Sequence, residues 1–389
     1  MRTKHAGFTL LELMVAMSIF LIIGGVTLGL FAQHVPLFNQ QQNQSALNIQ
    51  VRNSIMQLQT DVVNAGSGFI TSTDQSSGVL GVTIANSSST SGNSPTACNT
   101  ASTYTYPANC FDTLNVINVD TTVAAAHPEN GTFTSGYAAN PDDAVTTNTG
   151  SIYIYPPTGV TAATLLSEYE NAYSNSVEHE VLFVRSNGSL MTAVMLSSAP
   201  SATTVKNSVT CIQLTYNATN STGFSTAAND PLNISAVNNG NPKVTNTFYS
   251  TDYVLMMAPI TYSVSTATAS NPQLVRTSGG VSTVLAQQVI GFKVGAMLLD
   301  DTTSTCTGDP TLTTDSPKYC YDSAVDTNGG YSSQWTSIRS VQVALIGRTN
   351  PNPGSTYIDR NGFDSGPYQI EGVNVVINPR NLSMNDADF

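Results

Sequence analysis

Charged residues are scarce in this sequence. They make up 10% of its 389 residues, with 13 Lys and Arg against 25 Asp and Glu. The formal net charge of −12 repels phosphate, so nucleic acid is not expected as a partner. Only four histidines are present, and they form no Ser/His/Asp arrangement, HExxH motif or zinc-ligand spacing. The sequence therefore predicts a protein that is not an enzyme and has no cofactor.

Cysteine is also infrequent, with five residues in the chain. Cys98 lies 12 residues before Cys110, and Cys306 lies 14 residues before Cys320, each pair in a polar stretch. The spacing makes each pair a candidate for a disulfide that closes a local loop and adds about 3 kcal/mol of stability. Cys211 lies in the apolar run SVTCIQLTY, so we expect a buried thiol there.

The chain does contain one long apolar run near its N-terminus. Residues 8–32 include a single charged side chain, Glu12, and the basic residues Arg2 and Lys4 precede them. A helix of this length crosses a hydrocarbon core of about 30 Å. Because positive charge is retained on the cytoplasmic side of a membrane, we expect a cytoplasmic N-terminus and an exported remainder.

The stretch AGFTLLELMVAMSIF resembles the processing site of type IV prepilins and pseudopilins. The resemblance implies that residues 1–7 are a leader, that a membrane peptidase cuts between Gly7 and Phe8, and that Phe8 is then N-methylated. Glu12 becomes the fifth residue of the mature chain, which is the acid that marks this class. The implied protein is a single-pass prepilin of the inner membrane that later moves to a pilus on the cell surface. Its implied partners are the prepilin peptidase, the inner-membrane assembly platform, the lipid bilayer, and other major and minor pilins.

Glu12 needs a partner, because an unpaired carboxylate in hydrocarbon costs several kcal/mol. Cleavage before Phe8 creates an α-amino group about one helical turn away. We expect Glu12 to pair with this group in an isolated subunit and with the amino group of a neighbour in a filament. That exchange would help to set the axial register of assembly.

The stretch 39–64 changes from apolar to amphipathic. Its apolar residues recur every three or four positions, and they are Leu47, Val51, Ile55, Leu58 and Val62. This spacing predicts one apolar stripe on a helix that has Gln, Asn and Ser on its other faces and packs against a sheet. Gly66 and Gly68 are expected to end this helix. The assembly helix is therefore predicted over residues 8–65.

The exported body, residues 66–389, shows short strand-like runs and no comparable helical period. The runs are at 113–119, 151–155, 180–185, 190–196, 253–264, 289–298, 338–347 and 368–377. The polar tracts between them, at 84–109, 121–150 and 216–247, are interpreted as surface loops. The predicted fold is α+β and pilin-like, with a long helix packed on an antiparallel sheet that has large loop insertions.

The second half of the body resembles PilW-type minor pilins and J-type pseudopilins. The similar segments are ITYSVS, PQLVRTSGG and VLAQQVIGFKVGAML, while IRSVQVALIGRTNP and the ending VVINPRNLS favour the PilW type. The resemblance implies a minor pilin that initiates or primes assembly of a type IV pilus. The alternatives are a J-type pseudopilin of a type II secretion system and a pilus-tip adhesin. A body of this size would crowd a pilus shaft, which favours a position at or near the tip.

Several acidic residues near the last cysteine pair could bind calcium. They are Asp300, Asp301, Asp322, Asp326 and Asn328, although their spacing does not fit an EF-hand. Ordinary turns built from Asp and Asn are the alternative interpretation.

Overall fold

The computed structural model has one long helix, two shorter helices and two β-rich regions among the residues that it describes. The described residues are 9–66, 81–85, 106, 110–129, 145–146, 151–175, 180–187, 191–206, 209–216, 247–268, 270–300, 318–322, 338–350 and 366–383.

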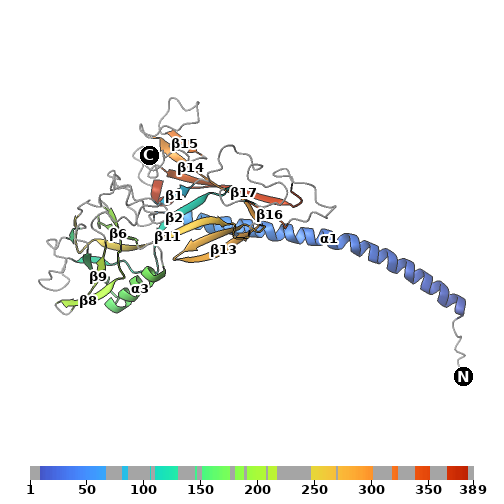
Figure 1. Cartoon of the computed structure of the whole chain (residues 1–389), viewed down its shortest axis with the longest axis horizontal. Coiled ribbons are helices and arrows are strands. Elements are labelled where there is room, and N and C mark those ends of the chain that lie inside the picture. Colours follow the sequence, from blue (N-terminus) through green and yellow to red (C-terminus); the bar gives the residue numbers. More distant parts are fainter. Residues whose placement is uncertain are drawn as a thin grey trace, which may run out of the picture.

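Helix α1 (Leu10–Val63) is the longest element, with 54 residues. Its first half projects away from the strands, and its second half lies against them (Figure 1). The helix ends at Asn64, and Gly66 then adopts a left-handed conformation with φ of 69°. The Gly66 amide donates to the carbonyl oxygen of Ile117 at 2.8 Å. The end of α1 is therefore fixed to a strand at the predicted stop.

Two antiparallel sheets surround the second half of α1. The seven-stranded sheet runs in the order β1 (Val82–Ala85), β2 (Thr113–Val119), β11 (Tyr253–Ser265), β12 (Gln273–Ser278) and β13 (Val281–Gln287), with β6 (Glu180–Val184) paired to β11 and β7 (Met191–Met195) paired to β6. The four-stranded sheet runs in the order β15 (Lys318–Asp322), β14 (Val289–Asp300), β16 (Ile338–Arg348) and β17 (Ile370–Ile377), and the short helix α5 (Arg380–Ser383) follows. The α+β pilin-like fold predicted from the sequence is confirmed.

The first hydrophobic core lies between α1 and these two sheets. The apolar stripe of α1 is buried there, at Leu47, Val51, Ile55, Leu58 and Val62. The strands contribute alternate residues such as Leu114, Tyr262 and Val343, all fully buried. Since the burial of a large apolar side chain is worth about 1.5–3 kcal/mol, this stripe is what attaches the helix to the sheets.

A second hydrophobic core is formed by residues that follow β2 in the sequence and extend to the first residues of β11. Helix α3 (Ala162–Asn175) contacts a four-stranded sheet in the order β3 (His127–Glu129), β5 (Ser151–Tyr155), β9 (Val209–Thr215) and β8 (Ser201–Lys206), and β4 (Val145–Thr146) pairs with β10 (Thr247–Phe248). Leu165 and Tyr169 of α3 are fully buried with Ile154 and Leu214. The described residues of the body thus form two cores.

Most of the predicted strand runs form strands, but the prediction of helices and loops was partly wrong. Helix α3 was missed, because its buried residues Leu165 and Tyr169 mark only one short stripe in a mostly polar segment. The tract 121–150 was interpreted as a loop, yet it contains β3 and β4 and the buried residue Ala126. Tertiary packing overrides the polar composition there.

The structure describes Cys110, Cys211 and Cys320 but not the predicted disulfide partners Cys98 and Cys306. Cys110 is disulfide-bonded, but Cys98 lies outside the described residues, so their pairing stays a prediction. Cys320 lies on β15, and its predicted partner Cys306 is likewise outside the described residues. Cys211 is buried on β9, where the apolar run indicated.

Arg348 is a fully buried cation at the end of β16. Its guanidinium donates to Gln288 Oε1 at 2.8 Å and to the Ser270 carbonyl oxygen at 3.0 Å. It also lies over the rings of Tyr106 and Tyr368, with 5.6 and 4.8 Å to the centroids. A planar cation with several donors suits such a site, and these contacts compensate for its burial.

Gly347 precedes Arg348 and lies where β16 faces the apolar stripe of α1. A Cβ atom at this position would lie 2.7 Å from Leu47 Cδ1 and 3.1 Å from Val51 Cγ2. The absence of a side chain therefore lets the helical stripe approach the strand.

We predict that Gly347→Val lowers the free energy of unfolding by about 1–3 kcal/mol, because the added methyl groups push α1 away from β16. Urea unfolding of the full-length protein in detergent, followed by circular dichroism, measures this. Gly372→Val on β17 is the matched control, since a Cβ atom there meets nothing closer than 3.6 Å. Equal losses in both variants would contradict the packing role of Gly347.

Candidate assembly helix and its attachment

The first turn of α1 is built around Thr9 and Glu12. Thr9 is the N-cap residue, and its Oγ1 accepts a hydrogen bond from the Glu12 amide at 3.3 Å. In return, Glu12 Oε2 accepts from the Thr9 amide at 2.9 Å and from the Thr9 hydroxyl at 3.0 Å. This reciprocal capping box satisfies donors at the start of the helix and gives the Glu12 carboxylate partners within its own chain.

Two hydroxyl groups in the apolar half of α1 (residues 10–38) also bond within the helix. Ser18 donates its hydroxyl to the Met14 carbonyl oxygen, and Thr27 donates to that of Ile23, both at 2.8 Å. Such bonds to the carbonyl four residues earlier let hydroxyl groups enter hydrocarbon without an unpaired donor. By length and composition α1 can cross a membrane.

The apolar half of α1 is exposed along its whole length in the isolated chain. The exposed large residues are Leu10, Leu11, Leu13, Met14, Val15, Met17, Ile19, Phe20, Leu21, Ile22, Ile23, Val26, Leu28, Leu30, Phe31, Val35, Leu37 and Phe38. An exposed apolar surface of this extent marks a contact with lipid or with other proteins.

Two further apolar residues continue this surface into the second half of α1. Ile49 is 57% exposed and Met56 is 64% exposed, whereas Val51 and Ile55 are buried. Ile49 and Met56 are seven residues apart and follow Val35 by fourteen and twenty-one, a repeat that suits packing of a second helix. The sequence-based interpretation assigned only polar residues to this face and missed both.

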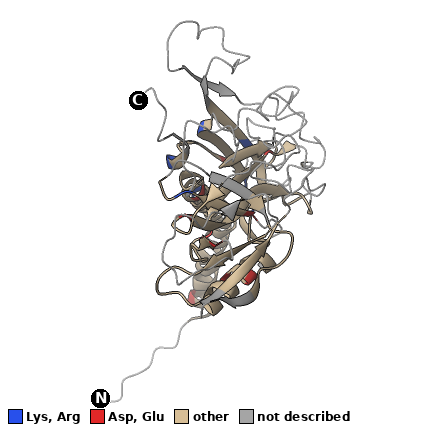
Figure 2. Cartoon of the chain, turned by 90° about the vertical axis from the view of Figure 1, so that its left-hand side faces the viewer, with Lys and Arg blue, Asp and Glu red and all other residues tan. Residues whose placement is uncertain are grey.

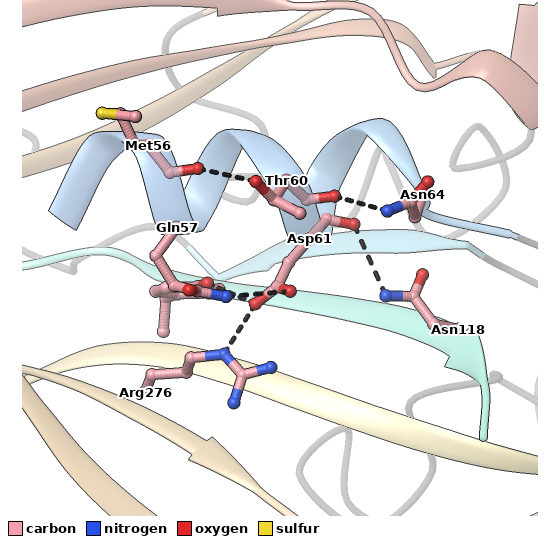
Figure 3. Close-up of polar contacts among 8 residues, drawn as sticks. Met56, Gln57, Thr60, Asp61, Asn64, Asn118 and Arg276 are labelled. Carbon is pink, nitrogen blue, oxygen red and sulfur yellow. Dashed lines mark hydrogen bonds and ion pairs between the residues drawn. The ribbon is translucent and has the colours of Figure 1, made fainter. Parts of the chain in front are cut away.

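Asp61 is the polar attachment between α1 and the seven-stranded sheet. Its side chain is 9% exposed, and Oδ2 lies 2.6 Å from Arg276 Nε on β12. The Tyr262 hydroxyl on β11 donates to the same oxygen, and Gln57 Nε2 donates to Oδ1 at 3.4 Å. Asn118 Nδ2 on β2 donates to the Asp61 carbonyl oxygen at 3.5 Å (Figure 3). One residue of the helix therefore binds three strands.

The environment of Asp61 changes how its neighbours titrate. Burial raises the pKa of Tyr262 far above its usual range, and the hydrogen bond to Asp61 and its negative charge raise it further. Burial lowers the pKa of Arg276, but the hydrogen bond to Asp61 and its charge outweigh burial, so the net pKa is raised. The arrangement thus keeps the Tyr262 phenol neutral and the Arg276 guanidinium charged where both contact the Asp61 side chain.

Arg276 is the arginine of the segment PQLVRTSGG that suggested a subclass from the sequence. Its role could not be predicted, because Asp61 lies 215 positions earlier and is one of several acids without a distinguishing local pattern.

Residues 2–28 match the family model described as the prokaryotic N-terminal methylation motif. This match, the apolar helix and the α+β body agree. The match supports the type IV pilin superfamily. Searches of curated proteins and of solved structures found no match. Pilin-like proteins are generally structural, and their motif implies pilins and assembly machinery as partners. The motif and α1 fit a membrane-anchored pilin.

The predicted processing site lies outside the described residues. Gly7 and Phe8 fall there, so the cut, the methylation and the pairing of Glu12 with the Phe8 amino group stay predictions. Among the described residues, no group of three His, Cys, Asp or Glu side chains could hold a metal ion. Asp300 pairs across the sheet with Lys318, at the opposite end of β15 from Asp322. Asp301, Asp326 and Asn328 lie outside the described residues, so calcium stays untested.

We predict that Asp61→Asn lowers the free energy of unfolding by about 2–4 kcal/mol, because it leaves Arg276 partly buried without its anion. Thermal and urea unfolding of the full-length protein in detergent measures the loss. Asp120→Asn is the control, since the Asp120 carboxylate accepts from the amide and hydroxyl of Thr122, two residues away in the same turn. Similar stability of both variants would contradict the attachment role of Asp61.

We also predict that stability falls as the pH rises above 10. An unfolded chain ionises Tyr262 near its ordinary pKa of 10.0, whereas the folded chain keeps it protonated. The unfolded state then binds fewer protons, so the free energy of unfolding decreases with pH. Tyr262→Phe is expected to be less stable at pH 8 but to lose less between pH 9.5 and 11. If the free energy of unfolding of Tyr262→Phe fell with pH as steeply as that of the wild type, this assignment would be contradicted. Some decrease is expected to persist in Tyr262→Phe, because burial also raises the pKa of Tyr155, to about 12.

Proposed function

We propose that this chain is a minor pilin of a type IV pilus, resembling the PilW type, that helps to initiate assembly and lies at or near the pilus tip. The observation that carries the proposal is the division of α1 into a bare apolar half and a half held by a large β body. A bare helix that begins with a methylation motif supports insertion in the inner membrane and later packing among pilins.

Size supports the position near the tip. Subunits of a pilus shaft pack closely along its axis, and the body contains two cores where one would serve to hold α1. In this proposal the prepilin peptidase processes the chain between Gly7 and Phe8, and the inner-membrane platform then adds it to the filament before any shaft subunit.

Glu12 supplies the charge for assembly. In the isolated chain its carboxylate is held by Thr9, which keeps the acid satisfied in the bilayer. Contact with the Phe8 amino group of a neighbour replaces hydrogen bonds to neutral donors with an ion pair, which is stronger in hydrocarbon.

We predict that Glu12→Val and Glu12→Gln both insert in the membrane but assemble few pili. Gln retains an oxygen that can accept from the Thr9 amide, so it preserves the cap and removes only the charge. Membrane fractionation and the yield of the chain in sheared pili measure the two steps. Normal assembly of Glu12→Gln would show that capping suffices and would contradict the ion-pair role.

The proposed function is tested by a deletion strain scored for sheared pili and for secreted proteins. Loss of pili with normal secretion is the expected result. Normal pili with loss of secretion would instead favour a J-type pseudopilin of a type II secretion system. If both persist, priming is refuted, and a tip adhesin is then tested through loss of surface binding in the same strain.

A further inference from the structure

The second core belongs to an insert whose two ends meet on neighbouring strands. We define the insert as residues 121–255. Strands β2 and β11 pair antiparallel, with Val119 opposite Met257, and the Asp120 amide donates to the Met256 carbonyl oxygen at 2.8 Å. The chain therefore leaves the sheet after β2 and returns to the adjacent position in β11. We call everything from α1 to β17 outside the insert the pilin core.

The insert has its own hydrophobic core. Among the described residues, Leu165, Tyr169, Phe183, Ile212 and Phe248 are buried with one another and belong to no cluster with α1. The two cores meet along β11. Its residues Tyr253–Met256 pair with β6 of the insert, and from Met257 onward the partner is β2 of the pilin core.

The insert lies beyond the end of α1. The Gly66 amide binds Ile117 near the end of β2, and the insert begins four residues after Ile117. Figure 1 shows α3, β6, β8 and β9 at the opposite end of the molecule from the N-terminus. Figure 2 views the molecule from this end, with the insert toward the viewer. The insert thus extends the body in the direction away from the membrane anchor.

A helical filament needs two complementary surfaces on each subunit, because head-to-tail contacts continue only if both are accessible. We propose that the insert covers the surface on which the subunit on the distal side would stack, and so confines this chain to the filament end. The inference rests on the proposed function as a pilin near the tip and adds the part of the chain responsible. The pilin core keeps the assembly helix, the four-stranded sheet and the part of the seven-stranded sheet that runs from β1 through β2, β11 and β12 to β13, while β6 and β7 belong to the insert. Growth on the other side is therefore unaffected.

The topology provides a direct test. Replacement of residues 121–255 by Asn-Gly joins β2 to β11 through a two-residue turn, for which Asn-Gly is a preferred sequence. The variant and the full-length chain each carry an epitope tag after Phe389 and are expressed in the deletion strain. Gold-labelled antibody then locates each protein on sheared pili. We expect one label at an end for the full-length chain and labels along the filament for the variant.

A matched control restores bulk without the native surface. In this control, residues 121–255 are replaced by an unrelated folded domain of similar size whose termini are adjacent, so that the domain connects β2 to β11. Labels confined to an end are expected again, because the proposal depends on occupied space. Two results would overturn the inference and leave the tip position intact. In the first, the Asn-Gly variant forms normal pili but its label is found only at their ends. In the second, the label of the domain-replaced variant is found along the pili. Full-length chain along the filament would instead refute the tip position itself.

A second measurement does not require the shortened chain to fold. The full-length chain is expressed in increasing excess over the other pilins. If each copy can only end a filament, pili become more numerous and shorter as its dose rises. Constant number and length, with more label along each pilus, would overturn the inference.

Discussion

The carboxylate of Asp61 links α1 to strands that are distant in the sequence. Burial of an acid on a helix is costly unless its oxygen atoms are occupied. Tyr262 and Arg276 meet this requirement from β11 and β12, and the Asp61 carbonyl oxygen adds Asn118 from β2. The contacts of this one residue therefore fix the positions of three strands relative to the helix, in the register in which the apolar stripe of α1 packs.

The sequence predicted the parts of the fold that have a local period. The stripe from Leu47 to Val62 and the alternating strand runs were identified because burial repeats at helical or strand spacing there. The Gly-Phe-x3-Glu spacing likewise indicated the class through residues that are close together in the chain. Helix α3 and strand β3 were missed, because polar and small residues dominate them and only packing in the second core decides their structure.

For the candidate site as well, the sequence identified residues that stand out locally but not the partners that they contact. Glu12 stood out as a charge in an apolar run, but the role of Thr9 as its hydrogen-bond partner required the geometry of the first turn. Asp61 and Arg276 could not be paired from the sequence, since 215 positions separate them and neither spacing nor composition connects them. Ile49 and Met56 were hidden among Gln and Asn residues, and only their exposure identified them.

Helix α1 is pinned at two places to two different sheets. Leu47 and Val51 fit against Gly347 of the four-stranded sheet, and Asp61 binds Arg276 of the seven-stranded sheet about 15 Å further along the helix. A pull along the helix axis would load both attachments and the stripe between them in shear, so that many contacts must yield together. The second core lies outside this load path, and β2 and β11 join it to the loaded part of the chain.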